Sequence, residues 1–266
     1  MRARRVAVLA DVHGNAVALA AVLNELEREQ PDAIVHCGDL TWGPLPAETY
    51  ELLAGWGVLF VRGNADRAVT ELAERLQDPG SEATPRERWL VEHHEAPLRL
   101  LLAAFPETVE LEVDGLGDVL FCHGSPRSDE ELVTIETPES RLAEALAGTS
   151  AGIIATAHTH VRYERHVLGR TLFNPGSVGM PYEGEPGAYW AMLGAPGASG
   201  ASGTNGPNGP NHSLIEHRRT AYDLDETERR YRASGDPLAN EMIDVLRHPP
   251  TPAEVIAHAE SLAFSG

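Results

Sequence analysis

Seven polar residues follow predicted strands at the points where those strands end, and every side chain offers a nitrogen or oxygen ligand. They are Asp11, His13, Asp39, Asn64, His123, His158 and His160. In open α/β sheets, functional groups gather beyond the carboxyl ends of the strands. Glycine stands beside several of them, in DVHGN, CGDL, VRGN and CHGS, and allows a tight turn or a close approach to a ligand. The repeated pattern predicts one polar site.

Each of these motifs also has an ordinary explanation when it is taken alone. Asp-x-His occurs often by chance, and Gly-Asp and Gly-Asn are common turn pairs. His158 and His160 give a stronger signal, because alternation in an extended segment places both rings on one face. Even this pair could be a hydrogen-bonded part of the core. The ordered set as a whole favours a metal site, and carboxylate, imidazole and amide ligands without a thiolate suit Mn, Fe, Ni or Zn.

The elements that must position these residues change character along the chain. The first third alternates strands, predicted at 4–10, 32–37 and 57–61, with helices, predicted at 15–30, 46–56, 67–76 and within 85–104. This order indicates a parallel sheet in an α/β fold. Hairpin patterns then follow, with strands predicted at 108–113, 117–122, 152–157, 162–168, 170–174 and 188–193 and a helix at 138–148. The change predicts two sheets that pack together with helices outside.

Residues 194–211 read GAPGASGASGTNGPNGPN, which offers nothing to bury and predicts a flexible loop. Strand-like sequences lie on both sides, so an enlarged hairpin is expected rather than a domain linker. We therefore expect one catalytic domain over 1–235 with this insert at 194–211. Residues 236–266 are expected to form a helical C-terminal extension packed on the same domain.

The charge and the cysteine content exclude several classes of protein. The chain has 266 residues and a formal net charge of -19, which repels nucleic-acid phosphates and anionic membranes. No stretch approaches the roughly 20 apolar residues that span a bilayer. Cys37 and Cys122 are too few for a disulfide framework and are expected to be buried packing thiols. We expect a soluble cytoplasmic protein that binds neither long nucleic acid nor membrane.

The ordered motifs resemble the calcineurin-like metallophosphoesterase superfamily. DVHGN, CGDL, VRGNADR, CHGS and AHTH occur in the order of that family, over about residues 6–189. GDLTWGPLP and FNPGSVGMP are similar to its small prokaryotic phosphodiesterase branch. The resemblance implies a four-layer α/β/β/α sandwich of two mixed β-sheets flanked by helices, with a centre of two divalent cations.

The resemblance also implies how the ligands divide. One cation would be bound by Asp11, His13 and His160, the other by Asn64, His123 and His158, and Asp39 would bridge the two. Two such cations can hold a bridging hydroxide and stabilise the charge that grows on phosphorus. The expected reaction is hydrolysis of a small phosphodiester or phosphomonoester, with the diester favoured because the similar branch leans that way. Asn64 is expected to contact the substrate as well.

Ala65 departs from the pattern of the superfamily, where a histidine at this place contacts phosphate and helps to protonate the leaving group. General acid catalysis contributes about 10²–10⁴-fold, so we expect either a preference for leaving groups that need little protonation or another acid in place of the histidine. No catalytic acid is assigned. Arg127 in HGSPR is the predicted phosphate contact, with an exposed loop arginine as the alternative. Asp66 is expected to cap a helix or form a salt bridge, and the remaining imidazoles to be structural or surface groups: His36, His93 and His94.

Two other functions fit the same fold. One is a non-catalytic metal-binding scaffold or interaction protein, which the presence of all seven ligands disfavours. The other is a dinuclear hydrolase that acts on a non-phosphate bond. The ligand types select no single cation, and nothing in the sequence specifies the oligomeric state.

Overall fold

Two mixed β-sheets face each other in the computed structural model, which describes residues 1–194 and 214–262. One, which we call the β2 sheet, has the order β11 (Ile215–Thr220), β10 (Ala188–Gly194), β2 (Arg5–Leu9), β3 (Ala33–His36) and β4 (Leu59–Phe60). The other, the β6 sheet, has the order β1 (Arg2–Ala3), β5 (Thr108–Val113), β6 (Gly117–Cys122), β7 (Ile153–Ala155), β9 (Arg170–Asn174) and β8 (Tyr163–Val167).

The central strands of each sheet run parallel, so their carboxyl ends share one edge. β2, β3 and β4 pair in parallel, with Leu9 opposite His36, and β10 joins β2 in the antiparallel direction. In the β6 sheet, β6, β7 and β9 are parallel, β5 is antiparallel to β6 but parallel to β1, and β8 is antiparallel to β9. The loops after β2 and β3 therefore lie at one edge of the β2 sheet, and the loops after β6 and β7 lie at one edge of the β6 sheet.

Alternating apolar side chains fill the space between the sheets. Val8 and Val35 of the β2 sheet belong to one buried cluster with Val119, Phe121 and Phe173 of the β6 sheet. Each of these side chains is fully buried. Burying one such side chain contributes about 1.5–3 kcal/mol, so this layer supplies a large part of the stability of the domain.

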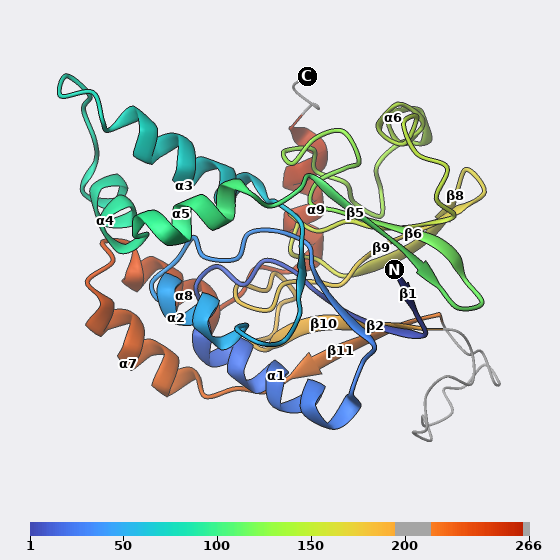
Figure 1. Ribbon diagram of the computed structural model, residues 1–266, viewed down its shortest axis with the longest axis horizontal. Coiled ribbons are helices and arrows are strands. Elements are labelled where there is room, and N and C mark those ends of the chain that lie inside the picture. The colour runs from blue at the N-terminus through green and yellow to red at the C-terminus, as the bar shows by residue number, and fades with distance from the viewer. Residues whose placement is uncertain (195–213, 263–266) are drawn as a thin grey trace.

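Helices cover the outer faces of both sheets (Figure 1). α1 (Ala16–Glu29), α2 (Pro46–Leu52) and α5 (Ala96–Ala103) flank the β2 sheet, where Leu19, Val22 and Leu26 of α1 enter the core. α6 (Glu139–Ala145) covers the β6 sheet through Leu142, which packs with Leu120. The four layers confirm the predicted α/β/β/α sandwich.

The remaining helices gather mainly at one end of the sandwich (Figure 1). They are α3 (Asn64–Arg75), α4 (Pro85–His93), α7 (Leu224–Ser234) and α8 (Ala239–Arg247), with α9 (Pro252–Ser261) beside the sheets. Tyr231 of α7 and Met242 of α8 share a buried cluster with Leu45 and Met180. The helices on either side of residue 235 therefore pack together, and the boundary at that residue stays a prediction. No helix of the described residues is long and apolar enough to cross a bilayer.

Three details differ from the sequence patterns or lie beyond the structure. β1 was not predicted, because two residues are too short for a periodic signal; it pairs with β5 before the chain crosses to β2. The predicted helical stretch 85–104 is two helices, with Pro97 in the first turn of α5. The hairpin insert predicted at 194–211 falls outside the described residues apart from Gly194, and the flanking strands β10 and β11 pair antiparallel.

Candidate metal centre

The predicted ligands form two adjacent clusters at the carboxyl ends of the strands. In the first cluster, ligand atoms of Asp11, His13 and His160 lie within 4.8 Å of one another. In the second cluster, ligand atoms of Asp39, His123 and His158 also lie within 4.8 Å of one another. Asn64 joins the second cluster, because its Oδ1 lies 3.0 Å from His123 Nε2. Residues from five separate loops thus meet in one place.

Backbone hydrogen bonds between neighbouring loops fix the positions of these residues. The N–H of Asp11 donates to Gly38 O at 3.0 Å, and the N–H of His13 donates to Asp39 O at 3.0 Å. The loops after β2 and β3 are therefore joined directly, as an extension of the parallel pairing of their strands. This arrangement follows from the main chain and requires no side chain.

Five of the seven residues have left-handed backbone conformations. The φ angles are 52° at Asp11, 47° at His13, 59° at Asp39, 65° at His158 and 58° at His160. A left-handed conformation costs a non-glycine residue about 1–2 kcal/mol. Such strain concentrates at functional sites, where the surrounding structure holds it in place.

Asp39 lies between the two clusters. Its Oδ2 is 3.6 Å from His13 Nε2 and 3.5 Å from His123 Nε2. Its other oxygen, Oδ1, accepts a hydrogen bond of 2.8 Å from the N–H of Ala65. The carboxylate therefore presents one oxygen to both clusters while the backbone holds the other.

Asp11 is a fully buried carboxylate whose two oxygens form no hydrogen bond with a described residue. Burial raises the pKa of its carboxyl well above the ordinary range. A buried charge is costly unless it is paired or binds a metal. Each cluster also contains a pair of imidazoles whose ring nitrogens lie close together. His13 Nε2 is 3.1 Å from His160 Nε2, and His123 Nε2 is 3.2 Å from His158 Nδ1. Unpaired Asp11 oxygens beside converging ring nitrogens fit a divalent cation in the first cluster, and Asp39 with the second imidazole pair fits one in the second.

The histidines differ in their protonation. Burial lowers the pKa of His158 to about 4, and burial also holds the pKa of His160 well below 6.5. Burial opposes the charged form of His123 too, but the Asp39 and Asp11 carboxylates and the Cys37 carbonyl together raise the His123 pKa to about 10. Metals bind neutral imidazole. His123 must therefore release a proton before it can bind a cation, whereas His158 and His160 are neutral at pH 7.

Carbonyl groups orient two of the rings. His123 Nδ1 donates to Cys37 O at 2.7 Å, and His160 Nδ1 donates to Met180 O at 2.6 Å. Because a carbonyl only accepts, each Nδ1 must carry the proton, and each Nε2 is left as the atom that faces its cluster. Such outer contacts fix the tautomer and the orientation of metal ligands.

Asp66 connects α3 to the loop that carries Asp39. Its fully buried carboxylate accepts three backbone N–H groups, those of Asp39 (2.9 Å), Leu40 (3.0 Å) and Gly63 (3.0 Å). Burial and the nearby Asp39 charge raise the pKa of Asp66 to about 7. The predicted capping role is confirmed, and it extends beyond the helix to the loop that holds Asp39.

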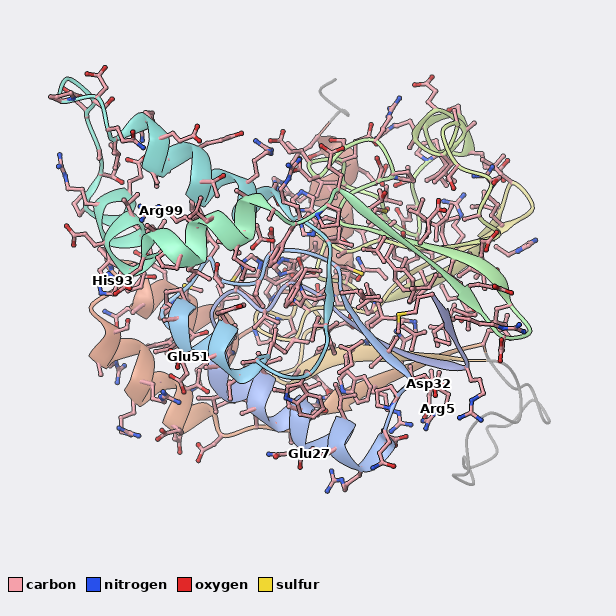
Figure 2. All side chains as sticks on the ribbon, in the orientation of Figure 1. Arg5, Glu27, Asp32, Glu51, His93 and Arg99 are labelled. Carbon is pink, nitrogen blue, oxygen red and sulfur yellow. The ribbon has the colours of Figure 1, made fainter. Side chains whose placement is uncertain are left out.

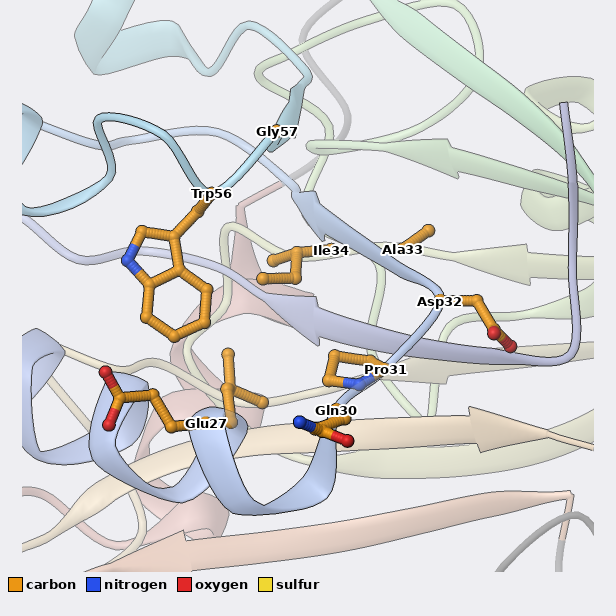
Figure 3. Close-up of a pocket in the computed structure, with 9 residues that line it drawn as sticks. Glu27, Gln30, Pro31, Asp32, Ala33, Ile34, Trp56 and Gly57 are labelled. Atoms are coloured by element: carbon orange, nitrogen blue, oxygen red, sulfur yellow. The ribbon is translucent and has the colours of Figure 1, made fainter.

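Arg127 lies beside the second cluster but is already paired. Its guanidinium is about half exposed and binds Glu131 at 2.6 Å. Arg127 and His123 both line a pocket of about 250 Å³. Its role as a phosphate contact stays a prediction. A larger pocket, of about 330 Å³, lies under Trp56 at the opposite end of β3 from Asp39 and contains none of the predicted ligands (Figure 3).

The other singled-out residues lie outside the two clusters. Cys37 and Cys122 are free, buried thiols, as predicted. His36 is buried and accepts from the N–H of Gly38 at 3.3 Å. His93 stacks on Trp89 near one edge of the molecule (Figure 2). His94 is buried between Leu90 O and the hydroxyl of Thr41.

The sequence patterns did not identify the segment 177–184 as part of the site. Met180 supplies the carbonyl that orients His160, and the ring of Tyr182 stacks on the same imidazole. The segment follows β9 as a loop without metal-ligating side chains before Glu183. Its only signal was the FNPGSVGMP motif, which carries no chemistry of its own.

Comparison with known proteins agrees with this geometry. Residues 5–194 match the family model of the calcineurin-like phosphoesterase superfamily domain. An uncharacterized protein of Methanocaldococcus jannaschii is 26% identical over 199 residues, which are 67% of this chain and 78% of that protein.

Solved structures resemble nearly the whole chain. A metallophosphoesterase from Sphaerobacter thermophilus has a TM-score of 0.68 at 26% identity, covering 91% of this chain and 98% of that one. A hypothetical protein from Pyrococcus horikoshii OT3 has a TM-score of 0.71 at 20% identity, covering 94% and 100%. The second similarity concerns the fold alone.

Proposed function

Because the chain belongs to the calcineurin-like phosphoesterase superfamily, we propose that it hydrolyses a small phosphodiester or phosphomonoester with two divalent cations. The observation that carries this proposal is the position of Asp39 Oδ2, within 3.6 Å of one imidazole from each cluster. A carboxylate oxygen in that position suits a ligand shared by two metals.

The proposed ligand sets follow the two clusters. Asp11, His13 and His160 would hold one cation, and a second set of side chains would hold the other: Asn64, His123 and His158, with Asp39 shared. Cations bound here would lower the pKa of a water and stabilise charge on the phosphoryl oxygens. Manganese, iron, nickel and zinc all suit these ligands.

Two residues are proposed to contact the substrate. Asn64 directs its Oδ1 towards His123, so its amide N–H groups remain to donate to a phosphoryl oxygen. Arg127 could exchange its partner Glu131 for a substrate anion across the pocket that His123 also lines. Both residues belong to the side of the centre formed by the second cluster.

The proposed leaving group needs little protonation, because Ala65 offers no proton donor. Its side chain is buried, and only its N–H contacts Asp39. Aryl phosphate esters should therefore be hydrolysed better than alkyl esters. We favour a diester over a monoester on the resemblance to the phosphodiesterase branch.

We propose that the substrate is a small anion met in the cytoplasm. The net charge of -19 disfavours long nucleic acids, whereas bound cations would attract a small phosphoester locally. The two free, buried thiols are typical of a reducing compartment.

The test compares two matched substitutions of acidic residues. Protein loaded with Mn²⁺, and in separate samples with iron, nickel or zinc, is assayed on bis-p-nitrophenyl phosphate and on p-nitrophenyl phosphate. Asp39→Asn should lose both bound metal and turnover, whereas Asp118→Asn, at an exposed position on β6, should match the wild type.

Two results would contradict the proposal. Equal turnover by the wild type and by Asp39→Asn would show that the centre is not the catalyst. Stoichiometric metal binding without turnover of any phosphoester would favour the metal-binding scaffold, or a hydrolase of a different bond.

A further inference from the structure

The loop from Ser177 to Gly184 is attached to the ligands of the first cluster by its main chain. Gly179 N–H donates to Asp11 O at 3.0 Å, and the hydroxyl of Ser177 donates to the same carbonyl at 2.8 Å. His160 Nδ1 donates to Met180 O at 2.6 Å. The loop therefore has a fixed position relative to Asp11 and His160.

Tyr182 is the aromatic side chain that this loop presents to the cluster. Its N–H donates to His160 O at 3.3 Å. Its ring stacks on the His160 imidazole, with ring centroids 4.6 Å apart and planes inclined by 18°. Backbone and ring thus hold Tyr182 to a single ligand residue, and the side chain has little freedom to turn away.

The hydroxyl of Tyr182 forms no hydrogen bond with a described residue. The oxygen is not fully buried, and the residue as a whole is partly buried. A tyrosine hydroxyl has an ordinary pKa of about 10, so it keeps its proton at neutral pH. An O–H donor thus lies on the ring that stacks on His160, a residue of the first cluster.

The opposite side of the centre lacks such a donor at the place where it is expected. Ala65 carries no polar side-chain atom, and its N–H is engaged with Asp39 Oδ1. A phosphoryl group on the metals carries negative charge on its free oxygens. An O–H donor that is already oriented would bind those oxygens with little reorganisation.

We infer that the Tyr182 hydroxyl donates a hydrogen bond to the phosphoryl group of the substrate, from the side of the centre formed by the first cluster. This inference rests on the proposed function. It assigns Tyr182 as a substrate-binding residue, whose ring is positioned by His160 and whose hydroxyl contacts the anion. No proton transfer is required of it.

The experiment removes the hydroxyl and keeps the ring. Tyr182→Phe retains the stacking on His160, so the affinity for Mn²⁺, measured by calorimetry, should equal that of the wild type. The value of kcat/KM on bis-p-nitrophenyl phosphate should fall about 10- to 100-fold, the value expected for one hydrogen bond to a charged group. The affinity of the Mn²⁺-loaded protein for inorganic phosphate should weaken by a similar factor.

Two further variants separate binding from structure. Tyr182→Leu also removes the stacking and should weaken Mn²⁺ binding as well as turnover. Tyr50→Phe makes the same chemical change on α2, where the ring packs against the buried cluster that contains Leu19 and Leu26 of α1. This variant should leave every measurement unchanged.

The possible results are distinct. Wild-type protein without phosphoesterase activity would overturn the proposed function. An active wild type with Tyr182→Phe unchanged in kcat/KM and in phosphate affinity would overturn only the inference about Tyr182. A loss of turnover in Tyr182→Phe that merely follows a loss of Mn²⁺ affinity would also overturn it, because the residue would then be structural.

Discussion

Gly63 should be essential to metal binding although it is not itself a ligand. A Cβ at this position would lie 2.1 Å from Asp39 Oδ1 and 2.4 Å from Asp39 N. The backbone itself would accept alanine, because Gly63 has φ -94° and ψ 167°. Gly63→Ala therefore tests the close approach to Asp39 without a change in backbone preference.

The size of the effect follows from the distances. Cβ atoms essentially never lie within 3.0 Å of a neighbouring heavy atom, so the Asp39 carboxylate must move by at least 0.9 Å, the difference between 3.0 and 2.1 Å. Metal–ligand distances tolerate only about 0.2 Å. We expect the affinity for Mn²⁺ to fall about 10- to 100-fold. The free energy of unfolding without metal should fall by about 1–3 kcal/mol, as for other overpacked positions.

The assay is calorimetric titration of the metal-free protein with Mn²⁺, together with urea unfolding. Gly152→Ala is the matched control, because a Cβ there would meet nothing within 4 Å. If Gly63→Ala bound Mn²⁺ as tightly as Gly152→Ala does, the carboxylate of Asp39 would have been free to move, and our account of a rigidly held bridging residue would fail.

Two more predictions concern buried groups near the centre. Asp66→Ala leaves three backbone N–H groups without their acceptor and should lower the free energy of unfolding by about 3–6 kcal/mol, and a loss below about 1 kcal/mol in urea unfolding would contradict this. Burial lowers the pKa of His94 to about 4 from the ordinary 6.5, so as the pH falls below 6.5 the unfolded chain takes up the proton first and stability is lost until about pH 4. Over that range the free energy of unfolding of the wild type should therefore fall by up to about 3 kcal/mol more than that of His94→Gln. If urea unfolding at pH 6.5 and at pH 4.5 gave the same fall for both proteins, the prediction would be refuted.

The clustering of the seven candidate ligands was largely predictable because these residues follow buried strands. Strand patterns located the ends of β2, β3, β6 and β7, and Asp11 and His123 come within two residues of such ends. Parallel pairing then brings the ends together. Of the two roles predicted for Asp66, a cap or a salt bridge, the structure shows the cap, and acidic residues in the first turn of a helix have a clear sequence signal.

The contacts that hold the ligands were less predictable, because they are made by the main chain. Nothing in the sequence signals that Met180 offers its carbonyl to His160 or that Ser177 reaches the backbone of Asp11. The left-handed backbone at Asp39 has no signal either, because aspartate has no strong preference for it. Tyr182 was missed because stacking on His160 depends on a loop whose path only the tertiary structure defines.

Ala65 contacts the Asp39 carboxylate through its backbone N–H and not through its side chain. Asp39 Oδ1 is held by the N–H of residue 65, and any residue except proline provides that N–H. The side chain at this position can therefore change without disturbing the Asp39 carboxylate. Under the proposed function, the absence of a histidine there would change the groups that contact the substrate and would leave the seven clustered side chains in place.

This separation explains how the donor to the substrate could come from a different element. The start of α3 contributes Asn64 and the N–H of residue 65 to the second cluster, whereas the loop carrying Tyr182 approaches from the first. Each element is joined to the ligands through its backbone, so side chains on either can vary independently. Under the proposed function, a change of donor from one side of the centre to the other would alter substrate preference while the seven clustered side chains stayed the same.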